Sequence, residues 1–176
     1  MPSAKMEYLV ETHLSSVFQF CCFLTGNRLD AEDLCQDTFL KAMELGSKFP
    51  CDGTERDSRN YLIGIAVRLW KNHQHKRQRR QRIAPEGILD ESSGNLTDGK
   101  ILEDQIIEQE LLTEVQKAIY QLPDKQKLVM HLYYSAEMNL EEIARLLHIP
   151  KETVKSRLRL AKNKLRKRLE VWEYER

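Results

Sequence analysis

The chain has 176 residues, of which 28 are Lys or Arg and 27 are Asp or Glu, and 41% of its residues are hydrophobic. A chain of this length forms one or two small domains. Seven Gly and five Pro are too few for a β-protein rich in tight turns, whereas helix-favouring residues predominate, so we expect an all-α fold. The most apolar stretch, residues 17–24, is too short to span a bilayer, and the N-terminal residues lack the apolar core of a secretory signal. We therefore expect no direct membrane insertion.

The cysteines and histidines follow no pattern typical of a metal site or a catalytic centre. Cys21, Cys22, Cys35 and Cys51 include no C-x-x-C pair, and no histidine lies at zinc-finger spacing from them. The sequence also lacks a Gly-rich phosphate loop and a nucleophile elbow, so we expect neither an enzyme nor a bound metal or cofactor. For the adjacent Cys21 and Cys22, buried reduced thiols in a cytoplasmic protein are the favoured interpretation, and a redox role is the alternative.

Charge divides the chain into three segments. Residues 1–83 carry 13 basic and 10 acidic side chains, residues 84–113 carry 1 and 8, and residues 114–176 carry 14 and 9. Seven Lys or Arg lie within residues 68–82 and nine within residues 151–168. Two such runs indicate polyanion-binding surfaces on two domains, although each run alone is also compatible with a solvated helix face.

The hydrophobic pattern predicts three helices in a first domain over residues 1–83. The apolar stripe of the first helix, over residues 6–24, contains Leu9, Val10, Leu14, Val17, Phe18, Cys21 and Leu24. Asp30 is expected to cap a second helix, which Gly46 ends. The third helix leads into the first basic run, and its apolar stripe contains Tyr61, Leu62, Ile65, Ala66, Leu69 and Trp70.

Residues 84–104 are predicted to form an acidic, flexible linker, because they contain Gly, Pro and Ser and almost no hydrophobic periodicity. A second helical domain is expected over residues 105–176. Its periodicity runs over residues 106–122, stops at Pro123 and resumes over residues 124–134.

Residues 140–168, LEEIARLLHIPKETVKSRLRLAKNKLRKR, predict a helix-turn-helix. Ile143 and Leu147 are expected to face inward from the first helix, and His148, Ile149 and Pro150 to form the turn. Val154, Leu158, Ala161 and Leu165 recur on the second helix at spacings of four, three and four, which marks its buried side. The residues expected to point outward, where they could enter a major groove, are Lys151, Thr153, Lys155, Ser156, Arg157, Arg159 and Lys162.

Residues 30–39, DAEDLCQDTF, residues 61–66, YLIGIA, and residues 122–126, LPDKQ, precede the helix-turn-helix along the chain. Together these motifs resemble the extracytoplasmic-function (ECF, group IV) sigma factors of the sigma-70 family. Residues 30–39, DAEDLCQDTF, look like the AED-x-x-Q-[DE]-TF signature of region 2, and residues 61–66, YLIGIA, resemble its W-L-x-x-I-A segment. Residues 122–126, LPDKQ, and the EIA and TVKSRL segments of the helix-turn-helix are similar to region 4. The resemblance covers nearly the whole chain and implies a region 2 bundle and a region 4 helix-turn-helix.

The resemblance also implies what each surface contacts. Region 4 would recognise the minus-thirty-five promoter element through the outward residues of the second helix. Region 2 would melt and hold the minus-ten element, and the candidate residues are Asn60, Arg68, Lys71, Asn72, His75 and Lys76. The second helix would bind the clamp helices in the largest subunit of the bacterial core RNA polymerase, through Asp33, Gln36, Asp37, Phe39 and Leu40.

Control by an anti-sigma factor, which could also hold the cytoplasmic protein at the membrane, is a further implication of the resemblance. The alternative to a sigma factor is a dimeric helix-turn-helix regulator that acts without polymerase, and it would need a sensor or dimerisation domain. Tyr61, Arg68 and Asn72 depart from the residues common in region 2, so the minus-ten sequence cannot be transferred from relatives. His148 replaces a frequent Gly and Leu160 a frequent Arg.

Overall fold

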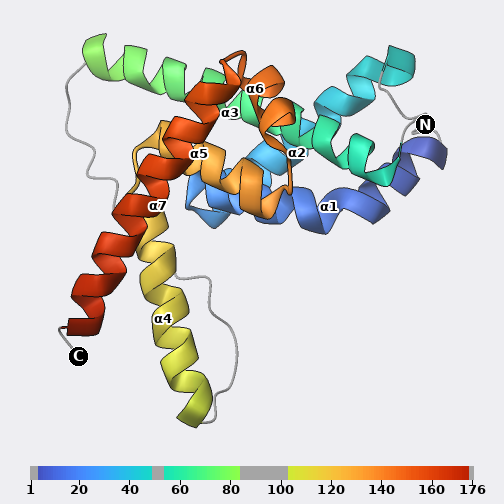
Figure 1. Cartoon of the computed structure of the whole chain (residues 1–176). Coiled ribbons are helices and arrows are strands. Elements are labelled where there is room, and N and C mark those ends of the chain that lie inside the picture. Colours follow the sequence, from blue (N-terminus) through green and yellow to red (C-terminus); the bar gives the residue numbers. More distant parts are fainter. Residues whose placement is uncertain (1–3, 49–53, 84–102, 175–176) are drawn as a thin grey trace. The chain divides into compact units, whose positions relative to one another are not determined.

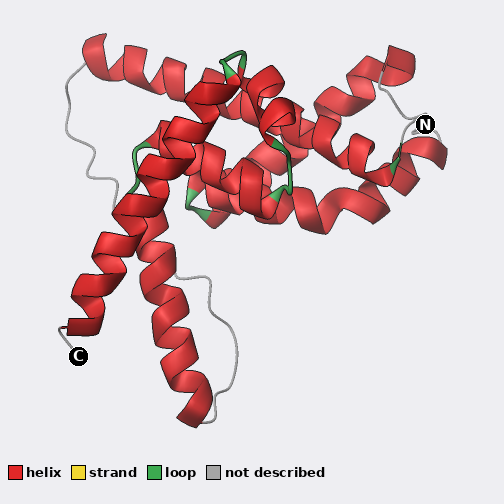
Figure 2. Ribbon diagram, viewed as in Figure 1, coloured by secondary structure: helices red, strands yellow, loops and turns green. Residues whose placement is uncertain are grey.

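The computed structural model describes residues 4–48, 54–83 and 103–174. Throughout these ranges the regular structure is helical, without strands, as the composition predicted (Figure 2). The chain divides into two compact units, residues 1–94 and 95–176. Nearly all of the linker predicted over residues 84–104 lies outside the described residues, and its last two positions begin a helix.

The first unit is built from three long helices, α1 (Ala4–Thr25), α2 (Arg28–Leu45) and α3 (Glu55–Ile83), with a short 3-10 helix, η1 (Gly46–Lys48), after α2 (Figure 1). Each long helix packs against the other two. The largest fully buried side chains at these interfaces belong to Val17, Leu34, Leu62, Ile63 and Val67.

The buried side of α1 differs from the predicted stripe. Leu14 is 47% exposed and Phe18 is half-buried, whereas His13 and Phe20 are buried. Because α1 packs against both α2 and α3, the two neighbouring helices determine which side is covered, and this side is turned away from Leu14. Tyr61 on α3, expected in the apolar stripe, is likewise at the surface.

The turn between α1 and α2 corrects the predicted helix cap. The side chain of Asn27 accepts hydrogen bonds from the backbone N–H groups of Leu29, at 2.8 Å, and Asp30, at 3.4 Å, so the cap is Asn27 and not Asp30. The preceding Gly26 has a φ of 68°, which glycine adopts without steric strain. Gly46 ends α2, as predicted, with a φ of 47°.

The second unit contains α4 (Glu103–Tyr120), α5 (Asp124–Met130), the π-helical turn η2 (His131–Ser135), α6 (Leu140–Leu147) and α7 (Lys151–Tyr174). Helix α7 packs against α4, α5 and α6, and Figure 1 shows α4 and α7 side by side along part of their lengths. Pro123 separates α4 from α5, as predicted. The predicted helix over residues 124–134 changes at His131 into the π-helical turn.

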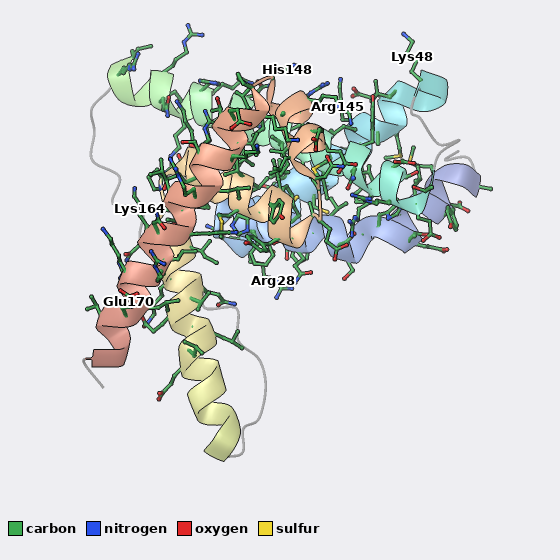
Figure 3. All side chains as sticks on the ribbon, viewed as in Figure 1. Arg28, Lys48, Arg145, His148, Lys164 and Glu170 are labelled. Atoms are coloured by element: carbon green, nitrogen blue, oxygen red, sulfur yellow. The ribbon has the colours of Figure 1, made fainter. Side chains whose placement is uncertain are left out.

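A sharp turn joins α6 to α7. Asn139 and Glu142 form a reciprocal capping box at the start of α6. At its end His148 is left-handed, with φ 54° and ψ 46°, and the N–H groups of His148 and Ile149 donate to the carbonyls of Arg145 and Ala144. This is a Schellman motif, the arrangement that usually employs glycine. Figure 3 labels His148 at this turn. Ile143, Leu147, Val154, Leu158 and Ala161 are buried, as predicted for the helix-turn-helix core. Leu165, predicted on the same buried side of α7, is only half-buried.

Candidate nucleic-acid interface

The outward residues of α7 do not all share one face. Lys155, Arg159 and Lys162, at spacings of four and three, are exposed and follow one line along the helix, which we call the basic strip. Thr153 and Arg157 are half-buried on a different line, four residues apart. Half-buried Ser156 lies between the two lines, and exposed Lys151 lies one turn before Lys155. The geometry thus favours the basic strip as the part of α7 open to a ligand.

Two lysines on this side of α7 already have acidic partners. Lys155 donates to Glu152 at 2.8 Å, and Lys151 donates to Glu141 on α6. Hydrogen bonds from Lys151 and Lys155 lower the pKa values of Glu141 and Glu152, respectively. Because these ion pairs are exposed, each contributes little to stability, and a phosphate could displace the carboxylate at small cost.

A second basic surface follows α3. Arg68, Asn72 and His75 are exposed at spacings of four and three, with exposed Lys76 beside them. Helix α3 runs unbroken to Ile83, so the whole first basic run is helical. Tyr61, 36% exposed, lies seven residues before Arg68 on the same side of the helix. Tyr61 was noted as a departure from region 2 but was not among the minus-ten candidates, because the apolar stripe assigned it to the core.

The other two candidates on α3 are less open. Lys71 and Asn60 are half-buried. The side-chain oxygen of Asn60 is buried and accepts no hydrogen bond from the residues that the structure describes. The structure therefore brings four of the six minus-ten candidates onto one exposed face and leaves Asn60 and Lys71 at its margin.

The exposed side of α2 carries both apolar and acidic groups. Leu29, Asp33, Gln36, Leu40 and Met43 recur at spacings of four, three, four and three, and all five are exposed; we call this line the α2 face. Exposed Asp37 flanks it. Leu29 and Met43 were not among the predicted polymerase-binding residues, although their spacing from Leu40 could have identified them.

Phe39 does not belong to the α2 face. Its side chain is only 6% exposed and packs in the core of the first unit. The signature motif DAEDLCQDTF thus mixes core positions, such as Leu34 and Phe39, with surface positions, such as Asp33 and Gln36. A motif read as a continuous string cannot separate the two sets, whereas the helical period does.

Three cysteines lie at the packed interface of α1 and α2. Cys21, Cys22 and Cys35 are buried and carry free thiols, while Cys51 lies outside the described residues. A hydrogen bond with Cys35 and burial raise the pKa of Cys21, and burial raises that of Cys22. Protonated thiols of this kind pack as small apolar groups. Among the residues described, no group of three or more His, Cys, Asp or Glu could hold a metal ion.

None of the helices among the described residues is long and apolar enough to cross a membrane.

Comparison with protein families defines the class of the chain. Residues 9–80 match the family model for Sigma-70 region 2, and residues 118–167 match the one for Sigma-70, region 4. The first match includes all of the α2 face and α3 as far as Arg80, and the second includes α6 and most of α7. The chain therefore has the two regions of a sigma-70-type sigma factor, in the predicted order.

Individual relatives narrow this class. The chain is 31% identical over 171 residues to the ECF RNA polymerase sigma factor SigW of Bacillus subtilis strain 168, covering 92% of this chain and 87% of SigW. The chain belongs to the ECF sigma factors, and the dimeric-regulator alternative is not favoured. Its fold is similar to the sigma factor RpoE in a complex with the anti-sigma factor NepR from Bartonella quintana (TM-score 0.76, 22% identity, 94% and 96% of the two chains). It is also similar to CnrH in a complex with the cytosolic domain of CnrY (TM-score 0.62, 19% identity, 94% and 88%).

Proposed function

We propose that this protein binds the core RNA polymerase and directs transcription from promoters with two recognition elements. The observation that carries the proposal is the presence of an exposed basic helical side on each of two separate units, α3 in one and α7 in the other. Each surface is suited to a polyanion. A protein of this construction can contact two short DNA elements separated along a promoter.

The basic strip of α7 is the proposed contact with the minus-thirty-five element. In a helix-turn-helix the second helix enters the major groove, where arginine and lysine contact guanine or the phosphates. Arg159 is the best placed of the predicted arginines, because it is exposed at the centre of the strip, whereas Arg157 is half-buried. Thr153 and Ser156 remain candidates at the margin.

The exposed side of α3 is the proposed contact with the melted minus-ten element. Single-stranded DNA is bound by positive charge along its backbone together with aromatic rings on which bases stack. Arg68 and Lys76 supply charge, His75 adds a polar ring, and Tyr61 adds an exposed aromatic ring on the same side. Asn60, Lys71 and Asn72 complete the candidate set.

The α2 face is the proposed site for the clamp helices of the polymerase. Apolar Leu29, Leu40 and Met43 can bury surface against a protein, and Asp33 can pair with a basic partner group. Asp33 and the flanking Asp37 would repel phosphate, so this face suits a protein and not DNA.

An anti-sigma factor is the proposed regulator. The supporting fact is that RpoE and CnrH, to which the fold is similar, were each solved in a complex with another protein. We place the free protein in the cytoplasm, with the anti-sigma factor able to hold it at the membrane. Purification from untreated cells should recover this partner, and recovery of the protein alone would contradict the proposal.

Separation-of-function variants test the division of labour. The double variant Leu40→Ala, Met43→Ala should lose binding to core polymerase and keep binding to duplex DNA. Arg159→Ala should instead weaken binding to duplex DNA and keep binding to core polymerase. Lys41→Ala is the matched control. Lys41 is exposed on α2 beside the α2 face, and its ammonium pairs with Glu44 at 2.7 Å. If the double variant bound polymerase like the wild type, the α2 face would not be the docking site.

A further inference from the structure

Tyr134 projects from the π-helical turn beside the basic strip of α7. Its side chain is 52% exposed, and its ring packs edge-to-face on Tyr133 with a centroid separation of 4.9 Å. The ammonium nitrogen of Lys162 lies 5.6 Å from the centroid of the Tyr134 ring. Tyr134 thus places an aromatic ring of the π-helical turn close to Lys162 of the strip.

The ammonium of Lys162 lies near the Tyr134 ring, and the two side chains differ in what they can donate. Hydrogen bonding with Tyr134 raises the pKa of Lys162, so the ammonium group is held in its charged form. A lysine ammonium can only donate, so Lys162 cannot take the proton of the tyrosine hydroxyl beside it. This leaves the hydroxyl proton of Tyr134 available to an acceptor outside the protein, next to the positive charge of Lys162.

A second lysine and tyrosine in the same unit provide a contrast. The ammonium of Lys127 on α5 lies 4.4 Å from the ring centroid of Tyr120 on α4, and Tyr120 is 51% exposed. Burial lowers the pKa of Lys127, and its exposed side-chain partner Asp124 lies 3.9 Å away. An acidic neighbour and a half-buried lysine make this pair unsuited to an anion, whereas Lys162 is exposed and follows two other cations along α7.

We propose that the hydroxyl of Tyr134 and the ammonium of Lys162 bind one backbone phosphate of the DNA together, which adds the π-helical turn to the DNA-binding surface. The inference rests on the proposed function, because it assumes that the basic strip lies against duplex DNA. The hydroxyl would donate to one phosphate oxygen and the ammonium to the same or the neighbouring oxygen. Such a contact orients α7 on the duplex without reading its sequence.

The test compares full-length variants on one duplex, which is selected from a randomised library by the wild-type protein. Tyr134→Phe removes the hydroxyl and keeps the ring, and Lys162→Ala removes the charge. Tyr134→Phe should weaken binding about tenfold and leave its salt dependence unchanged, because a neutral donor releases no counterion. Lys162→Ala should weaken binding and flatten the log-log salt slope by about one unit. Tyr120→Phe is the control and should bind like the wild type.

The double variant Tyr134→Phe, Lys162→Ala distinguishes a shared phosphate from two separate contacts. For a shared phosphate, the two losses in binding free energy are not additive. Additive losses, or wild-type affinity of Tyr134→Phe with an unchanged melting temperature, would overturn the inference. Failure of the wild-type protein to select any duplex would instead contradict the proposed function itself.

Discussion

His148 occupies a backbone conformation that favours glycine. It ends α6 at φ 54° and ψ 46°, and its side chain is exposed, so that truncation removes little packing. Replacing it with glycine leaves both Schellman hydrogen bonds available, since these use backbone groups. The substitution His148→Gly should therefore stabilise the second unit.

The size of this effect follows from two opposing contributions. The left-handed conformation costs a residue with a β-carbon about 1–2 kcal/mol. Glycine loses about 0.5–1 kcal/mol more conformational free energy on folding than alanine does. The expected net gain is about 0.5–1 kcal/mol, which corresponds to a rise of roughly 2–8 °C in the melting temperature of a unit of this size.

Calorimetry of the full chain is the appropriate measurement, because the two compact units can unfold in separate transitions. The transition of the second unit should move upward in His148→Gly and stay in place or fall in His148→Ala, which keeps the β-carbon. The first unit supplies an internal reference. An equal or lower melting temperature for His148→Gly would refute the assignment of strain to this residue.

Three further predictions concern DNA binding, pH and helix capping. Arg159→Ala should flatten the log-log salt dependence of duplex binding by about one unit if its guanidinium neutralises one phosphate. Arg157→Ala should weaken duplex binding as well. An unchanged salt slope for either variant would make that arginine a base-reading or structural residue. Burial, and to a smaller extent the charge of Lys127, lowers the pKa of His131 from 6.5 to about 4. As the pH falls below 6.5 the unfolded chain protonates this imidazole while the folded protein keeps it neutral. The stabilisation from His131 is therefore complete above pH 6.5 and is lost as the pH falls towards 4. The loss amounts to about 3 kcal/mol, and urea unfolding between pH 7 and pH 4 should show it in the wild type and not in His131→Leu. Asn27→Ala should destabilise the first unit by about 1 kcal/mol and Asn27→Asp should not, as measured by urea unfolding; equal stability of the alanine variant would contradict the capping role.

Much of the fold could be predicted because the hydrophobic period is strong where helices bury one side. The period located the helix-turn-helix core, from Ile143 to Ala161, because these side chains pack against a small number of neighbours within one unit. It misplaced the buried side of α1, because two packing partners cover a wider surface than one stripe. The π-helical turn at His131 has no signature in hydropathy, and the left-handed His148 was anticipated only through the resemblance to a family with glycine there.

The candidate surfaces were predicted less completely than the fold. Charge identified both basic runs, but residue type alone could not tell exposed Arg159 from half-buried Arg157. The signature motif placed Phe39 among the docking residues, although its ring fills the core. Tyr61 was assigned to the apolar stripe and Tyr134 was not singled out, and only the structure places both rings at the surface.

Promoter specificity is the property that we propose this protein confers on the polymerase. It is tested most directly by run-off transcription with purified bacterial core polymerase, this protein and a library of genomic or randomised promoters. We expect transcripts that require the protein and whose start sites share two spaced upstream motifs. Absence of protein-dependent initiation, with duplex binding intact and core polymerase unbound, would contradict it.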